Sequence, residues 1–213
     1  SRAEARILWL ENKGEFHFVE HEIEASGQPE GSSLTGFNMD YADLNADGRL
    51  DIVSTAWPGH LLLLRQPASP GQPWHTTIIG DLRPDQLVSV RLADIDGDGD
   101  LDAFSGAYSR GDRDQDSSQV TDSLGRISWF ENPGAQAVGQ PWQRHDISRR
   151  TRGMYDKWLA QDMDQDGDLD FVGTRGNSAP YDGVIWLEQI RTPSPAPNFT
   201  GARTADSRQM PLP

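Results

Sequence analysis

The 213-residue chain contains no cysteine. This absence excludes a disulfide framework, a thiolate metal site and a cysteine nucleophile. The usual signatures of other catalytic sites are missing too: there is no G-x-S-x-G elbow, HExxH pair, Walker loop or GxGxxG turn after a predicted strand. These absences favour a protein without catalytic activity, although they do not decide the question.

Long apolar runs and positive charge are also scarce. No run of 18 apolar residues exists, so no membrane span is predicted. The chain has 19 Lys and Arg against 33 Asp and Glu, for a net charge of −14. Nucleic-acid binding needs clustered Lys and Arg, so it is not expected. Thirteen of the acidic residues lie in three short segments, which indicates metal sites more than an acidic binding surface.

Those three segments share one pattern, D-x-[DN]-x-D-G-x-L-D, followed by an apolar run. Oxygen-bearing side chains stand at positions 1, 3, 5 and 9, with glycine at position 6. Ca²⁺ takes six to eight oxygen ligands at ~2.3–2.6 Å, and the glycine permits the sharp turn that folds a loop round the ion. Position 12, where an EF-hand has its bidentate Glu, is Ser54, Ser105 or Gly173. The sequence therefore predicts three Ca²⁺ sites that are not EF-hands.

The predicted ligands follow from these positions. The side-chain ligands are Asp43, Asn45, Asp47 and Asp51 in the first loop, Asp94, Asp96, Asp98 and Asp102 in the second, and Asp162, Asp164, Asp166 and Asp170 in the third. The position-7 backbone carbonyls of Arg49, Asp100 and Asp168 are expected to complete each shell, with the side chains of Asp100 and Asp168 pointing outward. The first loop has one carboxylate fewer, so we expect it to bind most weakly.

Strand-like segments recur in step with the loops, which lie 51 and then 68 residues apart. The first kind is ILWLEN (7–12), LLLLRQP (61–67), RISWFENPG (126–134) and VIWLEQ (184–189); the second is FVEHEI (18–23), WHTTII (74–79) and WQRHDI (142–147). The repeat unit is thus strand, Asp loop, strand, variable loop, strand, turn, strand, which is typical of a four-stranded propeller blade. The 17 extra residues of the second repeat fall in one loop, 109–125, as a repeat array predicts.

The expected fold is an all-β propeller of antiparallel blades. Residues 7–23 supply only two strands of a first blade, so the chain holds about three and a quarter blades. Closed propellers usually have 4–8 blades. We therefore expect a fragment or half of a larger, seven-bladed propeller, completed by missing N-terminal blades or by a second chain. The blades are assigned to residues 1–190, and the Pro-, Ser- and Thr-rich residues 191–213 to a linker-like tail.

The three Asp loops, and the Gly106-Ala107 pair after the second of them, resemble the FG-GAP/VCBS repeats, the calcium-loop blades also seen in integrin α-subunit propellers. The resemblance covers about residues 5–190. It implies a calcium-stabilised β-propeller on a secreted, periplasmic or cell-surface protein, and it does not imply one activity. Weak Ca²⁺ sites also favour the millimolar calcium found outside cells.

Loops at the opposite end of the blades vary in length and carry aromatic and polar side chains. The candidate ligand-binding residues there are Trp57, His60, Tyr108, Tyr155, Arg175, Asn177 and Tyr181. Aromatic rings can stack on sugars while polar groups bind hydroxyls, so the leading hypothesis is a binding or scaffold module for carbohydrate or protein. The alternatives are ordinary exposed loops, or the propeller domain of a secreted polysaccharide lyase or hydrolase.

Aromatic residues also repeat with the blades. Trp9, Trp129 and Trp186 occupy the same position in their strands, and we expect them to be buried between blades. His21 and His145 share a position in the following strand, two residues before an isoleucine. Because they repeat with the fold, these histidines are expected to be structural.

Overall fold

The computed structural model describes residues 6–83, 85–108, 125–150, 153–176 and 182–191. This part of the chain consists of β-strands and contains no helix, so no helix in it could cross a membrane. The predicted all-β class is confirmed. The tail from residue 192 and most of the 109–125 insertion lie outside the described residues.

The strands form four sheets, named here in chain order. Sheet 1 contains β1 (Ile7–Asn12) and β2 (Phe18–Ile23). Sheet 2 contains β3 (Ala25–Ser26), β4 (Ser33–Ala42), β5 (Asp51–Trp57), β6 (His60–Arg65) and β7 (Trp74–Asp81). Sheet 3 contains β8 (Gln86–Ala93), β9 (Asp102–Tyr108), β10 (Gly125–Glu131) and β11 (Gln143–Arg150). Sheet 4 contains β12 (Trp158–Gln161), β13 (Asp170–Arg175) and β14 (Gly183–Leu187).

Strands that follow one another in the sequence are neighbours in each sheet and pair antiparallel. The exception is the short β3, which pairs parallel with the outer strand β7. The grouping into two, four, four and three strands is the one that the repeat predicts, with β3 as an unpredicted addition. β1 and β2 have the predicted bounds, whereas β14 ends two residues before the predicted 189.

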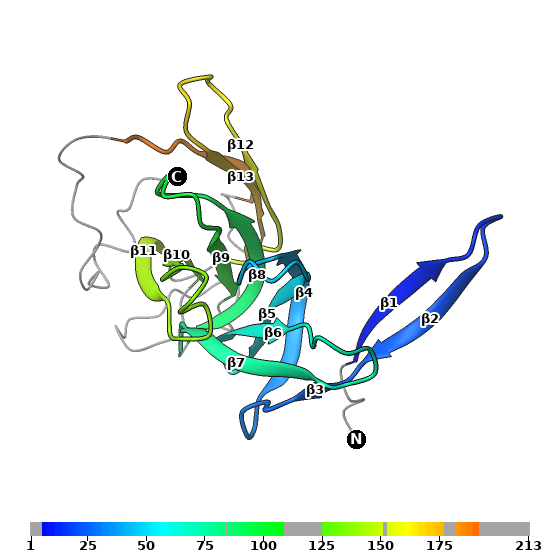
Figure 1. Ribbon diagram of the computed structural model, residues 1–213. Helices are drawn as coiled ribbons and strands as arrows, with labels where there is room; N and C mark the ends of the chain where they lie inside the picture. The colour runs from blue at the N-terminus through cyan, green and yellow to red at the C-terminus, as the bar shows by residue number, and fades with distance from the viewer. Residues whose placement is uncertain (1–5, 84, 109–124, 151–152, 177–181, 192–213) are drawn as a thin grey trace.

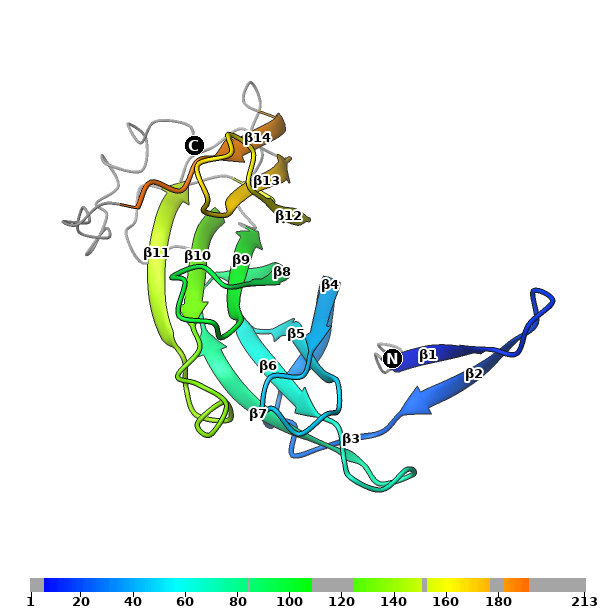
Figure 2. The same ribbon diagram turned by 45° about the horizontal axis from the view of Figure 1, so that its top comes forward.

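β8 of sheet 3 lies between β4 of sheet 2 and β12 of sheet 4, and the strands that follow each of them lie progressively farther out (Figures 1 and 2). The amide of Leu92 in β8 donates to Asp40 of β4 at 2.9 Å. The Ser89 hydroxyl of β8 donates to the carbonyl of Tyr155, just before β12, at 2.5 Å. Sheet 1 projects away from the others as a separate hairpin (Figure 1). Inner strands therefore join the three larger sheets.

Apolar side chains fill the spaces between the sheets. One cluster includes Leu61 and Leu63 of sheet 2 and Phe130 of sheet 3. A second includes Phe104 of sheet 3 and Phe171 of sheet 4, whose rings stack with centroids 3.7 Å apart. Because side chains alternate across a strand, each sheet can present apolar residues to the neighbour on either side. The four leucines of β6 are buried on both faces of their sheet.

The prediction that all three repeated tryptophans are buried is wrong. Trp9 is 47% exposed and Trp186 is 46% exposed, whereas Trp129 is partly buried. The reason is their position: β1 belongs to a two-stranded sheet, and β14 is the outer strand of sheet 4 among the described residues. Burial of this position needs a complete blade and a packed neighbour, which the sequence of one strand does not reveal.

The repeated histidines are equivalent, as predicted. His21 stacks on Trp9 and His145 on Trp129, in both cases with ring centroids 4.2 Å apart and planes 13° from parallel. His21 is 3.0 Å from Glu11, and His145 is 2.7 Å from Glu131. The same Trp–His–Glu contact therefore joins the third and fourth strands of two repeat units.

Candidate metal centres

Each Asp loop joins the innermost strand of its sheet to the next strand. The loops follow β4, β8 and β12 and end where β5, β9 and β13 begin. The position-6 glycines Gly48, Gly99 and Gly167 have φ values of +83°, +96° and +98°. This left-handed region costs other residues about 1–2 kcal/mol, which explains why glycine stands there. The three loops therefore turn in the same way.

Hydrogen bonds inside each loop hold its carboxylates in place. In the second loop, the amide of Gly99 donates to Asp94 at 3.2 Å, that of Asp98 to Asp96 at 3.1 Å, and that of Asp100 to Asp98 at 2.8 Å. The other two loops repeat these three bonds at distances between 2.8 and 3.3 Å. The backbone therefore orients the side chains at positions 1, 3 and 5.

The position-9 aspartate fastens each loop to the end of the third strand. Asp102 is buried, and it accepts from the amide of Ile95 at 3.0 Å and from that of Asn132 at 2.8 Å. Asp170 accepts equivalent bonds from Met163 and Gln189 at 3.0 and 2.9 Å. Sequence reasoning missed this second role, although its signal is visible: Gln66, Asn132 and Gln189 occupy the same place after the third strand.

The position-9 carboxyls of the second and third loops differ in their pKa values. Burial raises the pKa of Asp102 to about 6, against the opposing effect of the amides of Asn132 and Ile95. Burial acts in the same direction on Asp170, but there the Gln189 and Met163 amides prevail and lower the pKa. A carboxyl held at a raised pKa gains from a nearby cation, because the cation favours the charged form.

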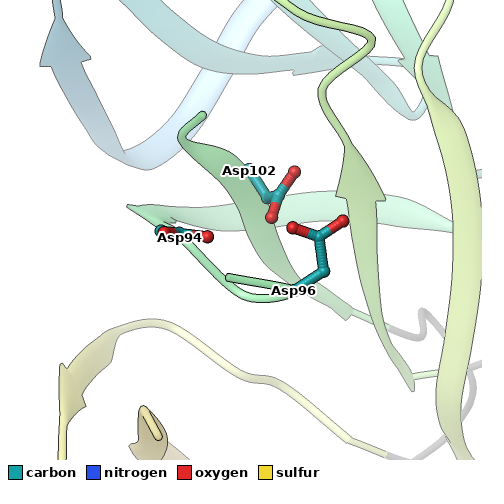
Figure 3. A group of neighbouring side chains, drawn as sticks. All are labelled: Asp94, Asp96 and Asp102. Carbon is teal, nitrogen blue, oxygen red and sulfur yellow. The ribbon is translucent and has the colours of Figure 1, made fainter. Parts of the chain in front are cut away.

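Two groups of carboxylates lie close enough to share one ion. In the second loop, Asp94, Asp96 and Asp102 place oxygens within 4.8 Å of one another. Figure 3 shows the carboxylates of Asp96 and Asp102 turned toward each other, with Asp94 across the loop. In the third loop, Asp162, Asp164 and Asp166 come within the same distance. All-oxygen donor sets of this kind suit a hard cation such as Ca²⁺.

The first loop differs from the other two. It forms no such cluster of three carboxylates, and Asn45 stands at position 3. The Asn45 amide donates to Asp47 at 2.8 Å, and the Arg49 guanidinium forms an ion pair with the same Asp47 oxygen. Arg49 also donates to the carbonyl of Gln66 at 3.2 Å, which fixes its position. A fixed positive charge thus occupies part of the predicted first site.

We expect Arg49→Ala to raise the Ca²⁺ affinity of the first loop by roughly fivefold, on the order of 1 kcal/mol for a partly exposed ion pair. The reason is that Asp47 would no longer be shared between a guanidinium and the ion. The measurement is a calorimetric titration in an Asp94→Asn, Asp162→Asn background, which isolates the first loop. Arg83→Ala is the matched control, because Arg83 pairs with Asp81 outside the loops. Unchanged or lower affinity in Arg49→Ala would count against competition by the guanidinium.

The side chain of Asp168 does not point outward as expected. It is 6% exposed, and burial raises its pKa. Arg191, in the segment that follows β14, lies beside this carboxyl and opposes the rise of its pKa. Arg191 and Gln189 also both donate to the carbonyl of Ile95, at 2.9 and 2.7 Å. This segment therefore joins the third loop to the second. Asp100 is partly exposed.

The predicted ligand-binding residues differ in how far their side chains are buried. Trp57 and Tyr108, at the ends of β5 and β9, are partly exposed. His60, Tyr155 and Arg175 have buried side chains, and Tyr155 is 0% exposed. Asn177 and Tyr181 lie outside the described residues. The sequence places all of these in loops, but it does not show that three of them turn into the protein.

Backbone bridges bring part of this group together. Met154 pairs with Tyr108 on one side and with Gly176 on the other, so the ends of β9 and β13 meet at the segment before β12.

The sequence did not predict one buried ion pair. Arg126 of β10 lies 2.9 Å from Asp85, which is fully buried. No motif in the sequence predicts a contact between these two residues.

The arrangement defines a class, an all-β repeat protein with oxygen-rich loops between the first two strands of its units. Residues 43–105 match the family described as FG-GAP-like repeat, so the chain contains an FG-GAP-like repeat over these residues. The match spans the first two Asp loops and strands β5 to β8. No curated protein matches the chain.

Proposed function

We propose that the protein is a calcium-stabilised binding or scaffold module whose repeat units are blades of a β-propeller. The observation that carries the proposal is the repetition of one loop geometry in three successive sheets, with the same glycine conformation and the same internal hydrogen bonds. An FG-GAP-like repeat is typical of such modules. The repetition of this geometry within the chain supports a structural role for the loops.

The propeller assignment rests on the order of the strands. In a propeller, four-stranded sheets are arranged round a centre with their first strands innermost. Sheets 2 and 3 have the required strand order, and β4, β8 and β12 lie at the inner side (Figure 2). Closed propellers have 4–8 blades, so further blades or a second chain would complete the ring. Completion would also cover edge strands, which otherwise favour aggregation.

We propose Ca²⁺ as the ion of all three loops, with the second and third sites stronger than the first. The second and third loops each bring three carboxylates together. In the first loop, Arg49 forms an ion pair with Asp47, one of the predicted ligands. When bound, the ion would neutralise carboxylates that otherwise repel one another. This proposal is consistent with an extracellular location, where calcium is abundant enough to fill weak sites.

We place the ligand, a carbohydrate or a protein, at the end of the sheets opposite the Asp loops. Each second strand runs from its loop to that end, where Trp57 and Tyr108 are partly exposed. The loops that follow vary in length between units, from the two-residue turn after β5 to the long insertion after β9. Variable loops on a fixed scaffold are common sites of recognition.

A glycan array with millimolar Ca²⁺ or EDTA tests this function. We expect binding that requires Ca²⁺ and that falls at least about fivefold in Tyr108→Ala, since truncating an aromatic at the centre of an interface commonly costs more than 1 kcal/mol. Tyr41→Ala is the control, because Tyr41 is an exposed aromatic one residue from the end of β4, beside the first Asp loop. Loss of binding in Tyr41→Ala with none in Tyr108→Ala would reverse the assignment of the binding end.

A further inference from the structure

The contacts between neighbouring sheets follow one rule, which β6 shows most plainly. Side chains alternate across a strand, so successive residues face different neighbours. Leu61 and Leu63 pack in the cluster between sheets 2 and 3, whereas Leu62 and Leu64 pack in the cluster that contains Ile7 of sheet 1. The side of a sheet that is turned to the next sheet in the chain is named here its forward face, and the opposite side its rear face.

The same alternation holds in the strands that are equivalent to β6. In β10, Ile127 packs toward sheet 4 and Phe130 toward sheet 2. In β14, Ile185 packs toward sheet 3, and in β1, Ile7 packs toward sheet 2. At all three junctions between successive sheets of the described chain, a forward face therefore meets a rear face.

The forward face of sheet 4 is apolar and exposed. Its side chains form a row across the sheet, since Leu159 pairs with Val172 and Val172 with Trp186. Leu159 and Trp186 are exposed, and so is Val184 on the same face of β14. Trp129, the equivalent of Trp186 in sheet 3, packs against sheet 4. An exposed apolar patch of this kind commonly marks a site of protein–protein contact.

The rear face of sheet 1 is apolar and exposed as well. Leu8 and Leu10 of β1 and Phe18 of β2 are the large apolar residues exposed on it. Leu10 holds the repeat position of Phe130, and Phe18 holds that of Trp142. Phe130 and Trp142 are both buried in the cluster between sheets 2 and 3. Sheet 1 thus carries the kind of side chain that a rear face uses at a junction.

These two exposed faces lie at opposite ends of the row of sheets (Figures 1 and 2). We propose that the forward face of sheet 4 in one copy of the protein packs on the rear face of sheet 1 in a second copy. The new contact combines the same two kinds of face as the three junctions inside the chain, so a second copy supplies what each face requires. Two copies related by a two-fold axis make this contact twice and close a ring of eight sheets, which is within the usual range of 4–8 blades.

The proposal rests on the blade architecture proposed above, and it names the second chain as another copy of this protein. It does not depend on the carbohydrate or protein ligand, so its tests use none, and Ca²⁺ is kept constant throughout. The rival occupant of either face is a blade of a different protein. A chain that carries both complementary faces favours self-association over that rival.

Analytical ultracentrifugation of the full chain tests the association. We expect a dimer that dissociates on dilution, with Kd on the order of micromolar. Trp186→Glu and Leu10→Glu should each weaken the association at least about tenfold, because each places a carboxylate in an apolar contact. Phe16→Glu is the control, because Phe16 is an exposed aromatic in the turn between β1 and β2, outside both faces. Val184→Glu provides a second, independent variant of the sheet 4 face.

A mixture of the two single variants gives the sharper test. In a mixed dimer of Trp186→Glu with Leu10→Glu, one contact joins the two altered faces and the other joins two unaltered faces. The mixture should therefore associate more tightly than either variant alone. In dilute solution both side chains are exposed, so the monomeric variants should melt close to the wild-type monomer.

Three results would overturn the proposal. The first is a wild-type protein that remains monomeric at about 100 µM, well above the expected Kd. The second is a dimer that persists unchanged in both variants, since other surfaces would then hold it. The third is a mixture that associates no better than its components. If any of these occurred while Phe104→Ala destabilised the protein as expected below, the association would be wrong and the blade architecture would stand.

Discussion

Chelation of calcium is expected to lower the melting temperature of the protein by roughly 5–10 °C for each site that was filled. An ion that binds only the folded state stabilises it by about 2.7 kcal/mol when its concentration is a hundred times Kd. In a protein of 150–250 residues, 1 kcal/mol corresponds to about 2–4 °C. The carboxylates of Asp94, Asp96 and Asp102 lie close together, so loss of the ion also leaves their repulsion unopposed.

Single-site variants measure how much each loop contributes to the stabilisation by calcium. Asp94→Asn and Asp162→Asn should each remove the contribution of one loop, and the double variant should respond least to EDTA. Asp81→Asn serves as a control, because Asp81 is an acid on β7 that pairs with Arg83 outside the loops. Scanning calorimetry in EDTA and in millimolar Ca²⁺ provides the comparison. Equal melting temperatures under the two conditions would contradict a stabilising role for calcium.

Phe104→Ala is expected to destabilise the fold by roughly 3–5 kcal/mol, the usual cost of truncating a buried phenylalanine. Phe104 stacks on Phe171 and meets the Trp158 ring edge-on at 4.9 Å, so it joins sheets 3 and 4. Trp186→Ala should cost less than about 1 kcal/mol, because its side chain is substantially exposed. Urea denaturation of the two variants measures the difference.

A second variant separates lost packing from overcrowding. A Cβ added at Gly173 would lie 2.4 Å from atoms of the Trp158 ring, so Gly173→Ala should also destabilise, by forcing that ring to move. If Phe104→Ala proved no more harmful than Trp186→Ala, sheets 3 and 4 would not share the core described above.

The Asp loops could be predicted from the sequence because their structure is local. Position-6 glycine, short acidic side chains and a fixed spacing determine the turn without help from the rest of the chain. The order of strands was also predictable, since each unit repeats its segments in the same sequence. Asp102 illustrates the limit: its position as a ligand is local, but its burial and its bond to Asn132 depend on the third strand.

Burial across sheets was less predictable. The sequence places Trp9, Trp129 and Trp186 at one repeat position, yet only Trp129 has packed neighbours on enough sides to be mostly covered. Tyr155 and Arg175 show the opposite case: Tyr155 stands in the segment before β12 and Arg175 at the end of β13, and both are buried where these parts of the chain meet. The Arg126–Asp85 ion pair joins residues 41 positions apart, and no pattern in either segment predicts this contact.

Calcium titration of the metal-free protein by isothermal calorimetry tests the central claim most directly. We expect three sites per chain, with the weakest assigned to the first loop by its disappearance in Asp43→Asn. Asp94→Asn and Asp162→Asn should each remove one of the two stronger sites. Absence of calcium uptake, or a single site unaffected by these substitutions, would contradict the account.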